Sequence, residues 1–336
     1  MSLRFCLVPL GKACSGLRGL SNHCLSCCVN ALLQAFSATW ELAELLDKWE
    51  TAGVREEDEN IPLNLRRVLV AMKSARPLLP PHKDFLLCLE RNRIRRNTQH
   101  DADQVFLFIL NAVVQQIDNR SLALEVQNLY KISTETHLQC SSCSSAQIQS
   151  SYLLNLQLPV KEEHDSLEGC LTSYFRHEEL QGENCCFCPK CGTQTPSKWG
   201  VKLLSLPQVL CISFKRFRGN LDGTRKLHCV VTFPESFDFS EVVKEAFASS
   251  FTQLQNGCGY TLYAVVVHAG NASCGHYTAF VRHPSDQHWY HADDSRVKRV
   301  SWEEVKSAYG GSSRDTAYML MYRRGPSEGL QPGLPT

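Results

Sequence analysis

Apolar residues recur at three- and four-residue spacing through most of the segment 29–130. The pattern is clearest in NALLQAFSATWELAELLDKW, LNLRRVLVAMKSA and DADQVFLFILNAVVQQI. This spacing puts the apolar side chains on one face of a helix, so these runs predict helices. Loops are predicted at 51–60, which is polar and charged, and at 76–84, where prolines end one helix and Lys83 and Asp84 could open the next.

Beyond residue 130 the pattern changes to short segments with a period of two, rich in β-branched and aromatic residues. They are YKISTETHLQC, AQIQSSYLLNLQLPV, GVKLLSL, QVLCISFKRF, HCVVTF, YTLYAVVVHAG, HYTAFVRH and DTAYMLMYRR. These segments predict a half that is mostly sheet. One helix is predicted at SWEEVKSAYG, because Ser301 and Glu304 have capping-box spacing and Gly310 can end the helix. The two halves together predict an α+β protein.

The composition is that of a globular protein with a sizeable core. The 336 residues are 43% hydrophobic and 21% charged, which suits one large domain or two ordinary ones. The formal net charge of +1 gives no global field for a nucleic acid or an anionic membrane. The basic run ERNRIRRN at 90–97 is interpreted as a solvated helix end. We therefore expect no nucleic-acid partner.

The ends of the chain predict neither a signal peptide nor a membrane segment. The N-terminal run MSLRFCLVPLGKACS lacks the apolar length and cleavage site of a signal peptide, and no apolar stretch reaches the roughly 18 residues that span a bilayer. We expect an intracellular, cytoplasmic protein without membrane insertion, and a nuclear location stays open. Residues 1–15 are expected to form a separate N-terminal segment, and 324–336, rich in Gly and Pro, a disordered tail.

The 17 cysteines are treated as thiols, because disulfides are rare in a reducing compartment. Four of them form two C-x-x-C knuckles. These are Cys140 with Cys143 and Cys188 with Cys191. Tetrahedral zinc takes four thiolates at about 2.3 Å, so the strands between the knuckles would have to form a ribbon that brings them together. Unrelated surface thiols or a redox pair remain alternatives, as does competition from Cys185 and Cys186 beside the second knuckle.

One further cysteine, Cys27, lies where the chain enters a helix predicted to begin near Val29. Unpaired N–H groups and the helix dipole favour a thiolate there. A nucleophilic cysteine also needs a base and a group that orients the base. GHYTAFVRH supplies His276, and WYHADDS supplies Asp293 and Asp294 at the end of the next predicted strand. From the residues alone, buried packing cysteines and structural histidines remain an equal alternative.

A set of ordered motifs resembles the ubiquitin-specific protease family. The motifs are GLRGLSNHCLSCCVNALLQ, QHDADQVF, the two knuckles, LPQVLCISFKRF, YTLYAVVVHAG, GHYTAFVR and WYHADDS. They span about residues 16–323, which the resemblance implies is one catalytic domain. The implied fold is α+β and papain-like, with a helical thumb at about 16–130, zinc-ribbon fingers at about 131–203 and a β-rich palm at about 204–323.

The resemblance also implies a role for each residue that matches the family motifs. Cys27 matches the nucleophile, His276 the general base and Asp293 the residue that orients the imidazole. Asn22 matches an asparagine of the oxyanion hole, and Asp294 a neighbouring acid that assists.

Two more parts of the site are implied by the same resemblance. Asp101 matches the aspartate that holds the extended tail of the modifier. The zinc ligands of the fingers are matched by Cys140, Cys143, Cys188 and Cys191. The implied cofactor is therefore a structural Zn²⁺, because four thiolates leave no open coordination position.

Softer features resemble family members that act on an interferon-induced, two-lobed ubiquitin-like modifier. They are the GLxGL opening, the doubled cysteine before Val29, QHDA, CFCPKCG, FDFSEVV and SWEEVKSAYG. The implied function is a thiol isopeptidase that removes this modifier from lysine side chains and damps interferon signalling. The alternatives are a weakly active scaffold that binds the modifier or interferon-receptor components, and a general deubiquitinase. A zinc-dependent nucleic-acid binder would rest only on the knuckles and scattered basic residues.

Three positions depart from the family pattern. Cys24 stands where relatives usually have Gly, so a positive φ there would add strain. Leu25 cannot donate a side-chain hydrogen bond, and the loss of an oxyanion donor costs about 10²- to 10³-fold in rate. Ala292 replaces a usual aromatic beside Asp293 and is expected to loosen it. Reduced activity is therefore one expected outcome.

Overall fold

The computed structural model describes residues 17–50, 57–74, 82–220, 223–244, 258–312 and 314–325. The predicted N-terminal segment 1–15 lies outside these residues, as does the predicted tail beyond residue 325. Among the described residues, no helix combines the length and the apolar character needed to cross a membrane.

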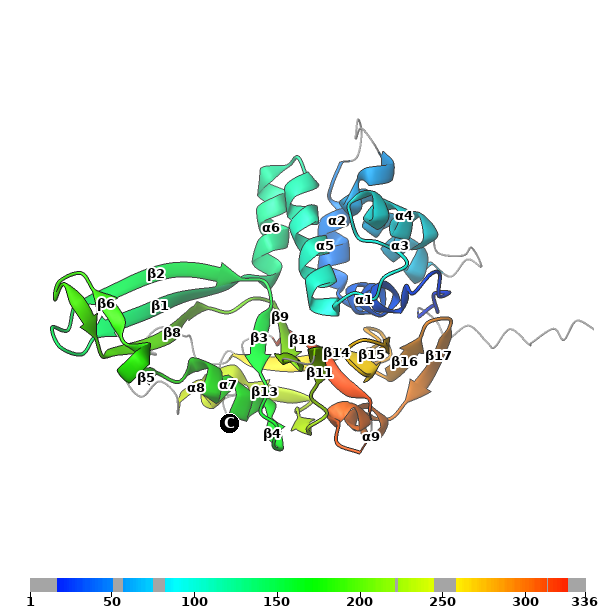
Figure 1. Cartoon of the computed structure of the whole chain (residues 1–336). Helices are drawn as coiled ribbons and strands as arrows, with labels where there is room; N and C mark the ends of the chain where they lie inside the picture. Colours follow the sequence, from blue (N-terminus) through cyan, green and yellow to red (C-terminus); the bar gives the residue numbers. More distant parts are fainter. Residues whose placement is uncertain are drawn as a thin grey trace, which may run out of the picture.

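The N-terminal part of the chain is helical, as its hydrophobic period predicts. Its helices are α1 (Cys27–Ala38), α2 (Trp40–Asp47), α3 (Ile61–Lys73), α4 (His82–Arg91), α5 (Ala102–Gln116) and α6 (Arg120–Tyr130), with a 3-10 turn at Glu57–Glu59. Helix α1 is buried along its whole length. It packs on strands β14 and β15 and on helices α3 and α5, so it forms the contact between the helical layer and the sheet below it (Figure 1).

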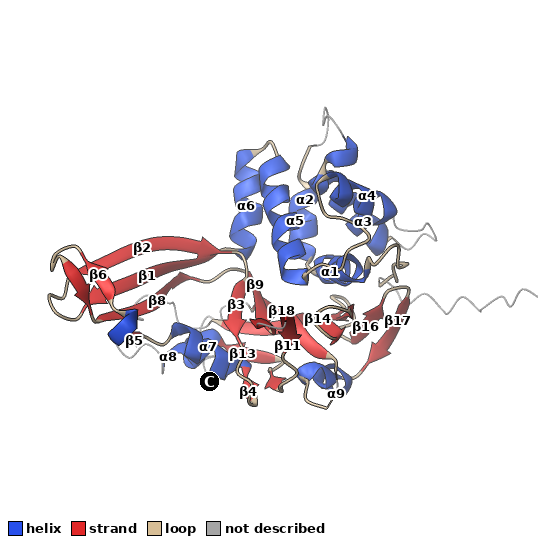
Figure 2. Cartoon of the chain, viewed as in Figure 1, coloured by secondary structure: helices blue, strands red, loops and turns tan. Residues whose placement is uncertain are grey.

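Eight strands of the described chain form the large palm sheet. Along the sheet they are β17 (Arg296–Val300), β16 (Trp289–Asp293), β15 (Gly275–Arg282), β14 (Gly259–Gly270), β18 (Thr316–Arg324), β9 (Val209–Lys215) and β3 (Leu156–Pro159), with β13 (Ser236–Asp238) paired to β14. Its pairs are antiparallel except for β3 with β9. Figure 2 shows this sheet beneath the helices, so that the protein has a helical lobe resting on a β-rich one.

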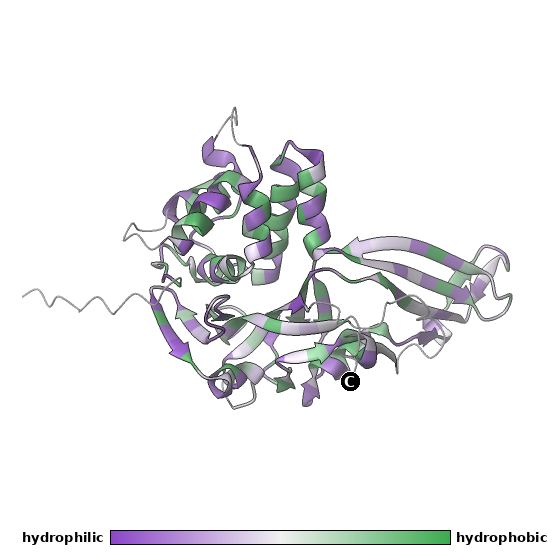
Figure 3. Ribbon diagram, turned by 180° about the vertical axis from the view of Figure 1, so that it is seen from behind, coloured by the Kyte–Doolittle hydropathy of each residue, from purple (hydrophilic) through white to green (hydrophobic). Residues whose placement is uncertain are grey.

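The residues of β14 show why the sheet carries a core on both faces. Ala264 and Val266 belong to the cluster that the helices α1 to α6 cover, whereas Val265 and Val267 belong to a second cluster on the opposite face. Successive side chains of a strand point to opposite faces, so a central strand buried on both sides is apolar throughout. Figure 3 shows hydrophobic and hydrophilic residues alternating around the helices that cover the first cluster.

A four-stranded sheet extends away from both lobes as the fingers. Its order is β2 (Ala146–Leu153), β1 (Ile132–Cys140), β8 (Ser197–Ser205) and β5 (Glu178–Leu180). The short hairpin of β6 (Cys186–Cys188) and β7 (Thr193–Thr195) lies at its far end (Figure 1). The observed α+β fold of helical thumb, finger sheet and palm agrees with the predicted fold class. The domain boundaries near 130 and 203 stay predictions.

The β-rich half differs from its prediction in detail. The segment 146–160 forms two strands in different sheets, β2 and β3, and the predicted strand HCVVTF forms only β12 (Val231–Thr232), which pairs with β4 (Asp165–Ser166). A hairpin joins β10 (Phe217–Asn220) to β11 (Gly223–Lys226). The helices α7 (Leu167–Phe175) and α8 (Phe239–Lys244) and a turn at Gly182–Asn184 are not predicted by the period.

The predicted helix near the C-terminus is confirmed. Helix α9 (Trp302–Val305) begins with the capping box of Ser301 and Glu304, and a 3-10 turn (Lys306–Tyr309) continues it. Gly310 follows with φ 102°, a left-handed conformation that favours glycine.

Candidate active site

The loop before α1 brings Cys27 to the N-terminus of a buried helix. The helix begins at Cys27, two residues earlier than predicted, and its first internal hydrogen bond runs from the Asn30 N–H to the Ser26 carbonyl at 2.8 Å. The Cys27 N–H therefore has no acceptor within the helix. Two hydrogen bonds between residues of the loop stabilise it. The Ser26 N–H donates to Asn22 Oδ1 at 3.1 Å, and Ser26 Oγ accepts from the His23 N–H at 2.8 Å.

Two residues of this loop adopt a left-handed backbone. Cys24 has φ 55° and Leu25 has φ 62°, and neither is a glycine. Such a conformation costs a residue with a Cβ about 1–2 kcal/mol. The strain expected at Cys24 from the sequence is therefore present, and it extends to Leu25, whose side chain is exposed.

The antiparallel pairing of β15 with β16 brings the predicted base and its orienting acid together. His276 lies near the start of β15, Asp293 ends β16, and Ala279 pairs with Ala292 between them. His276 Nε2 is 2.7 Å from Asp293 Oδ1. Cys27 lies close enough to His276 to interact with its imidazole and raise its pKa. In this structure, Ala292 is buried and leaves the contact of Asp293 with the imidazole intact.

The surroundings of His276 and of Cys28 both raise the pKa of the group, but for different reasons and with opposite effects on its charge. The interaction with Cys27, and then the hydrogen bond with Asp293, raise the pKa of His276 to about 9 against the opposing effect of burial. The imidazole therefore stays protonated at neutral pH. Burial raises the pKa of Cys28 well above its usual value, with a smaller contribution from the charge of Cys27. Cys28 is therefore a neutral core thiol.

Asp294 ties the loop before α1 to the palm. Its Oδ2 accepts from Asn22 Nδ2 at 2.9 Å, its Oδ1 accepts from Asn30 Nδ2 at 2.8 Å, and its carbonyl accepts from the Leu20 N–H at 2.8 Å. The backbones approach closely here, since a Cβ on Gly19 would lie 2.2 Å from the Ser295 carbonyl oxygen. Asn22 and Asp294, predicted separately to assist catalysis, are thus brought into direct contact.

Asp101 caps the N-terminus of α5. Its Oδ1 accepts from the Asp103 N–H at 2.9 Å and the Gln104 N–H at 3.4 Å, and its Oδ2 accepts from the Tyr318 hydroxyl at 2.5 Å. The carboxylate therefore links the helical layer to strand β18 of the palm. Burial, and then the nearby charge of Asp101, raise the pKa of the Tyr318 phenol, which stays a donor in this bond.

A buried polar cluster behind Asp101 was not predicted. Asp103 is buried and accepts hydrogen bonds from Asn155 and Gln157, while the Ser213 hydroxyl is 3.4 Å from its Oδ1. Burial raises the pKa of the Asp103 carboxyl, and these bonds oppose the shift. The sequence signal is a second acid two residues after the helix cap, which on its own indicates only a favourable charge in the first helical turn.

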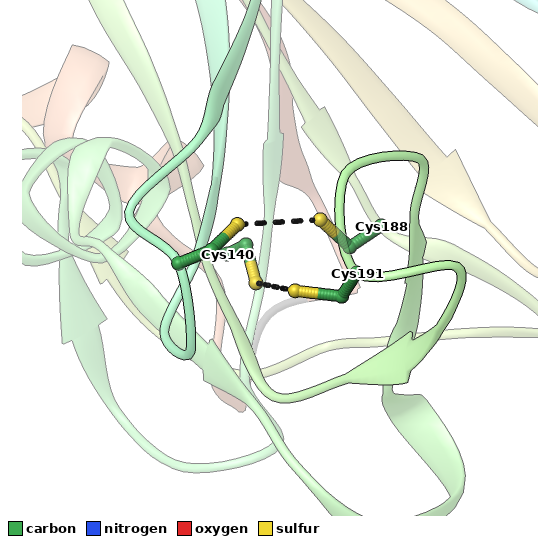
Figure 4. Close-up of side chains that lie close together, drawn as sticks. Cys140, Cys188 and Cys191 are labelled. Carbon is green, nitrogen blue, oxygen red and sulfur yellow. Dashed lines mark hydrogen bonds between the residues drawn. The ribbon is translucent and has the colours of Figure 1, made fainter.

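The two knuckles lie together at the far end of the fingers. The Sγ atoms of Cys140, Cys143, Cys188 and Cys191 all lie within 4.8 Å of one another. The Cys140–Cys191 and Cys143–Cys188 separations are 3.9 and 3.6 Å, and Figure 4 shows the second knuckle facing the first. Four sulfurs at about 2.3 Å from a tetrahedral ion would be about 3.8 Å apart. The donor set and its spacing therefore fit a tetrahedral metal ion.

Other metal-binding groups are weaker candidates in the described chain. Cys185 and Cys186 are not part of the four-sulfur group, so the competition considered from the sequence is not observed. His276, Asp293 and Asp294 also lie within 4.8 Å of one another, but their polar atoms are engaged with Cys27, Asn22 and Asn30.

A family comparison agrees with this architecture. The family model described as ubiquitin carboxyl-terminal hydrolase matches residues 18–322. The chain belongs to that family, which confirms the family predicted from the motifs. It is a cysteine-type hydrolase that acts on the carboxyl terminus of ubiquitin or a ubiquitin-like protein.

Individual relatives refine the comparison. The chain is 34% identical over 317 residues to mouse Ubl carboxyl-terminal hydrolase 18, covering 92% of this chain and 86% of the relative. It is 32% identical to the human protein of that name, covering 92% and 85%. Human ubiquitin carboxyl-terminal hydrolase 47 is 25% identical, with 94% of this chain and 28% of the relative covered.

A solved structure has the same fold. It is the SAGA Ubp8/Sgf11/Sus1/Sgf73 DUB module bound to ubiquitin aldehyde, with a TM-score of 0.76 and 23% sequence identity. The match covers 94% of this chain and 70% of that chain.

Proposed function

We propose that the chain is an isopeptidase whose nucleophile is Cys27. The observation that carries this proposal is the position of His276 between Cys27 and Asp293. The Cys27 thiolate attacks the carbonyl carbon of the modifier's C-terminal glycine. The tetrahedral intermediate then loses the lysine amine, which takes a proton from His276, and a thioester remains. His276 next takes a proton from water, whose oxygen displaces Cys27 and releases the carboxylate.

Asn22 is the proposed side-chain donor of the oxyanion hole. Its amide nitrogen carries two hydrogens, of which one is committed to Asp294 at 2.9 Å, so the second is available for the developing oxyanion. The Cys27 N–H at the start of α1 is the proposed backbone donor. Asp294 thus assists by fixing the orientation of Asn22. This pair of donors compensates for Leu25, which offers no side-chain hydrogen bond.

Asp101 is proposed to bind the arginine of the modifier's Leu-Arg-Gly-Gly type of tail. Its carboxylate already accepts from two backbone N–H groups and from Tyr318, and a carboxylate has about four acceptor positions. A guanidinium could therefore bind without displacing the cap. The existing bonds orient the carboxylate, which lowers the entropy that tail binding would cost.

The proposed substrate is the interferon-induced, two-lobed ubiquitin-like modifier on lysine side chains of proteins. The similarity to the Ubl carboxyl-terminal hydrolases supports this choice over ubiquitin. The tail alone cannot discriminate between the two modifiers, so selectivity has to come from contacts with the modifier's body. A pocket of about 400 Å³ at the junction of α5, β2 and β3, lined by residues that include Leu107, Tyr152 and Gln157, lies where such contacts are expected.

The finger strand β2 is the stronger of two candidate contact surfaces. Its residues 146–152 are exposed, and they include the large apolar side chains of Ile148 and Tyr152. The other candidate, the palm segment 258–263, is mostly buried because Cys258, Tyr260, Leu262 and Tyr263 lie in the core. We therefore assign body recognition to β2 and the adjoining pocket.

The four-cysteine group is proposed to hold a structural Zn²⁺. The sulfur spacing supports this assignment, and Cys140, Cys143, Cys188 and Cys191 would occupy all four positions of a tetrahedral ion. The ion would join the two knuckles at the finger tip, far from α1 (Figure 1). It would therefore stabilise the fingers and take no part in bond cleavage.

The cellular setting is proposed from weaker support. No disulfide joins the cysteines of the described chain, which suits the cytoplasm. The resemblance to the interferon-related branch of the family supports a role in damping interferon signalling, with receptor components as further partners. A scaffold that binds the modifier without cleaving it is the rival, favoured by the strained loop at Cys24 and Leu25.

A propargylated modifier probe tests the isopeptidase proposal against the scaffold. The wild type and Cys28→Ala are expected to form a covalent adduct, whereas Cys27→Ala is expected to form none but still to bind the modifier. The modified residue is located by mass spectrometry. An adduct in Cys27→Ala that is lost in Cys28→Ala would contradict the assignment, and binding without any adduct in the wild type would favour the scaffold.

A further inference from the structure

The backbone that carries His276 lies on a sheet edge that β16 does not cover. Strand β16 pairs with β15 only from Ala279 to Arg282. On this side, Gly275 to Thr278 have no strand partner among the described residues, while β14 pairs with β15 on the other side. His276 therefore lies on the part of β15 with one paired edge.

Gln99, from the loop before α5, occupies this open edge. Its Nε2 donates to the Gly275 carbonyl at 3.0 Å, and its Oε1 accepts from the Gly275 N–H at 3.2 Å. One side-chain amide thus makes both bonds that a neighbouring strand residue would make. The pair joins the helical layer to the residue directly before His276, across 176 positions of sequence.

We propose that Gln99 is a positioning residue that fixes the backbone of His276 relative to Cys27. The proposal rests on the proposed function of this Cys27–His276 pair. Asp293 orients the imidazole ring through its 2.7 Å contact. The position of the ring also depends on the backbone of His276, which has to be fixed as well. Gln99 supplies that backbone restraint from the same layer that carries Cys27.

The residue at position 275 explains why such a restraint is needed. A Cβ at Gly275 would lie 2.1 Å from His268 Nε2 and 2.5 Å from the Ala269 carbonyl oxygen, so glycine is required. Glycine also has the greatest backbone freedom, and Gly275 stands at the half-buried start of the strand. The two bonds from Gln99 remove that freedom next to the proposed base.

Several charged or titratable groups face His276 and have to be considered in any test by pH. Cys27 comes from α1, while Asp293 and Asp294 come from the end of β16 and the turn after it. His268 comes from β14 and stays neutral, because burial lowers its pKa to about 3. Gln99 has no charge, so its replacement changes the position of His276 without changing the charges around it.

Alkylation of Cys27 by iodoacetamide tests the proposal, because this small reagent does not use the modifier-binding surface. The rate at Cys27 is followed by mass spectrometry across pH. In Gln99→Ala, reactivity at neutral pH is expected to fall and the profile to move to higher pH by about one unit, a size typical of perturbed groups. Gln99→Met keeps a side chain of similar length without charge but makes neither bond to Gly275, so the same shift as in Gln99→Ala is expected.

Turnover of a modifier with a C-terminal fluorogenic amide gives a second readout. Gln99→Ala is expected to lower kcat by about 10- to 100-fold, as small misplacements do, with KM nearly unchanged. Gln104→Ala is the matched control, because Gln104 is exposed on the first turn of α5. It is expected to behave as wild type in both assays.

Two results separate failure of this inference from failure of the proposed function. An unchanged alkylation profile in Gln99→Ala, with or without a raised KM, would overturn the positioning role. A wild-type profile that His276→Ala leaves unchanged would instead contradict the Cys27–His276 pair itself.

Discussion

Cys27 and Cys28 are neighbours in the sequence, but the structure gives them different chemistry. Cys27 interacts with His276, whose pKa is raised to about 9 by that interaction and by Asp293. Cys28 has no such partner, and burial raises the pKa of its thiol. The thiolate is the nucleophilic form of cysteine, so a single position along the helix separates a reactive thiol from an inert one.

The raised pKa of His276 predicts an alkaline limit to activity. Acylation needs a protonated imidazole to supply the leaving amine. Because the pKa lies near 9 and not near 6.5, kcat/KM is expected to hold up to about pH 9 and to fall above it. Asp293→Asn removes a contact that raises this pKa, so its alkaline limb is expected at lower pH. Identical alkaline limbs for the two proteins would contradict the role of Asp293.

The backbone strain at Cys24 predicts a stabilising substitution. Cys24→Gly relieves a left-handed residue with φ 55°, and the free energy of unfolding is expected to rise by about 1 kcal/mol. Denaturant unfolding measures the change. Cys274→Gly is the control, because Cys274 is an exposed free cysteine that is not among the residues with positive φ. Equal or lower stability of Cys24→Gly would show that the loop is relaxed as it stands.

At the residue scale, the sequence predicts which residues carry the chemistry better than it predicts the contacts that these residues make. Cys27, His276 and Asp293 are found from residue types, strand order and family motifs. The bond of Asp294 to Asn22 and the bond of Tyr318 to Asp101 are not predicted. They depend on a turn with φ 48° at Asp294 and on contacts between the helical layer and the sheet, which no local pattern encodes.

The elements differ in how clearly the sequence predicts them. Helix α9 is predicted because the capping box of Ser301 and Glu304 is a local signal with fixed spacing. Helix α7 is missed, although Ser166 caps it through the Gly169 N–H at 3.0 Å. Its nine residues bury Leu167, Leu171 and Phe175 against the palm, so tertiary packing decides the helix more than its weak period does.

The finger sheet gives a prediction about metal. Purified protein is expected to contain about one zinc per chain, and removal by a chelator to lower Tm by roughly 5–10 °C, because metal binding contributes folding free energy. Cys188→Ser is expected to do the same. Cys186→Ser is the matched control, since Cys186 lies two residues away but outside the four-sulfur group. Metal-free protein with an unchanged Tm would exclude a structural zinc.

Over the whole molecule, the active site lies at the contact of two layers that differ in sequence pattern. Cys27 belongs to the helical layer, whereas His276 and Asp293 belong to the palm sheet. The connections between the layers around them include Asp294 with Asn22, Tyr318 with Asp101, and Gly275 with Gln99. The change of period near residue 130 predicts the layers, but the register between them is visible only in the folded chain.

The proposed substrate is also decided at this scale, because the tail-binding residues do not distinguish one modifier from another. Discrimination is assigned to β2 and the adjoining pocket, neither of which includes Cys27, His276 or Asp101. A difference of 1.4 kcal/mol in binding gives about a tenfold difference in rate, so one well-placed contact is enough.

The most direct test of the account compares kcat/KM for matched C-terminal fluorogenic substrates of the two-lobed modifier and of ubiquitin. Wild type and Cys27→Ala are measured from parallel preparations. The wild type is expected to prefer the two-lobed modifier at least about tenfold, as one such contact provides, and Cys27→Ala is expected to turn over neither substrate. Equal or ubiquitin-favouring kcat/KM in the wild type, or turnover that persists in Cys27→Ala, would contradict it.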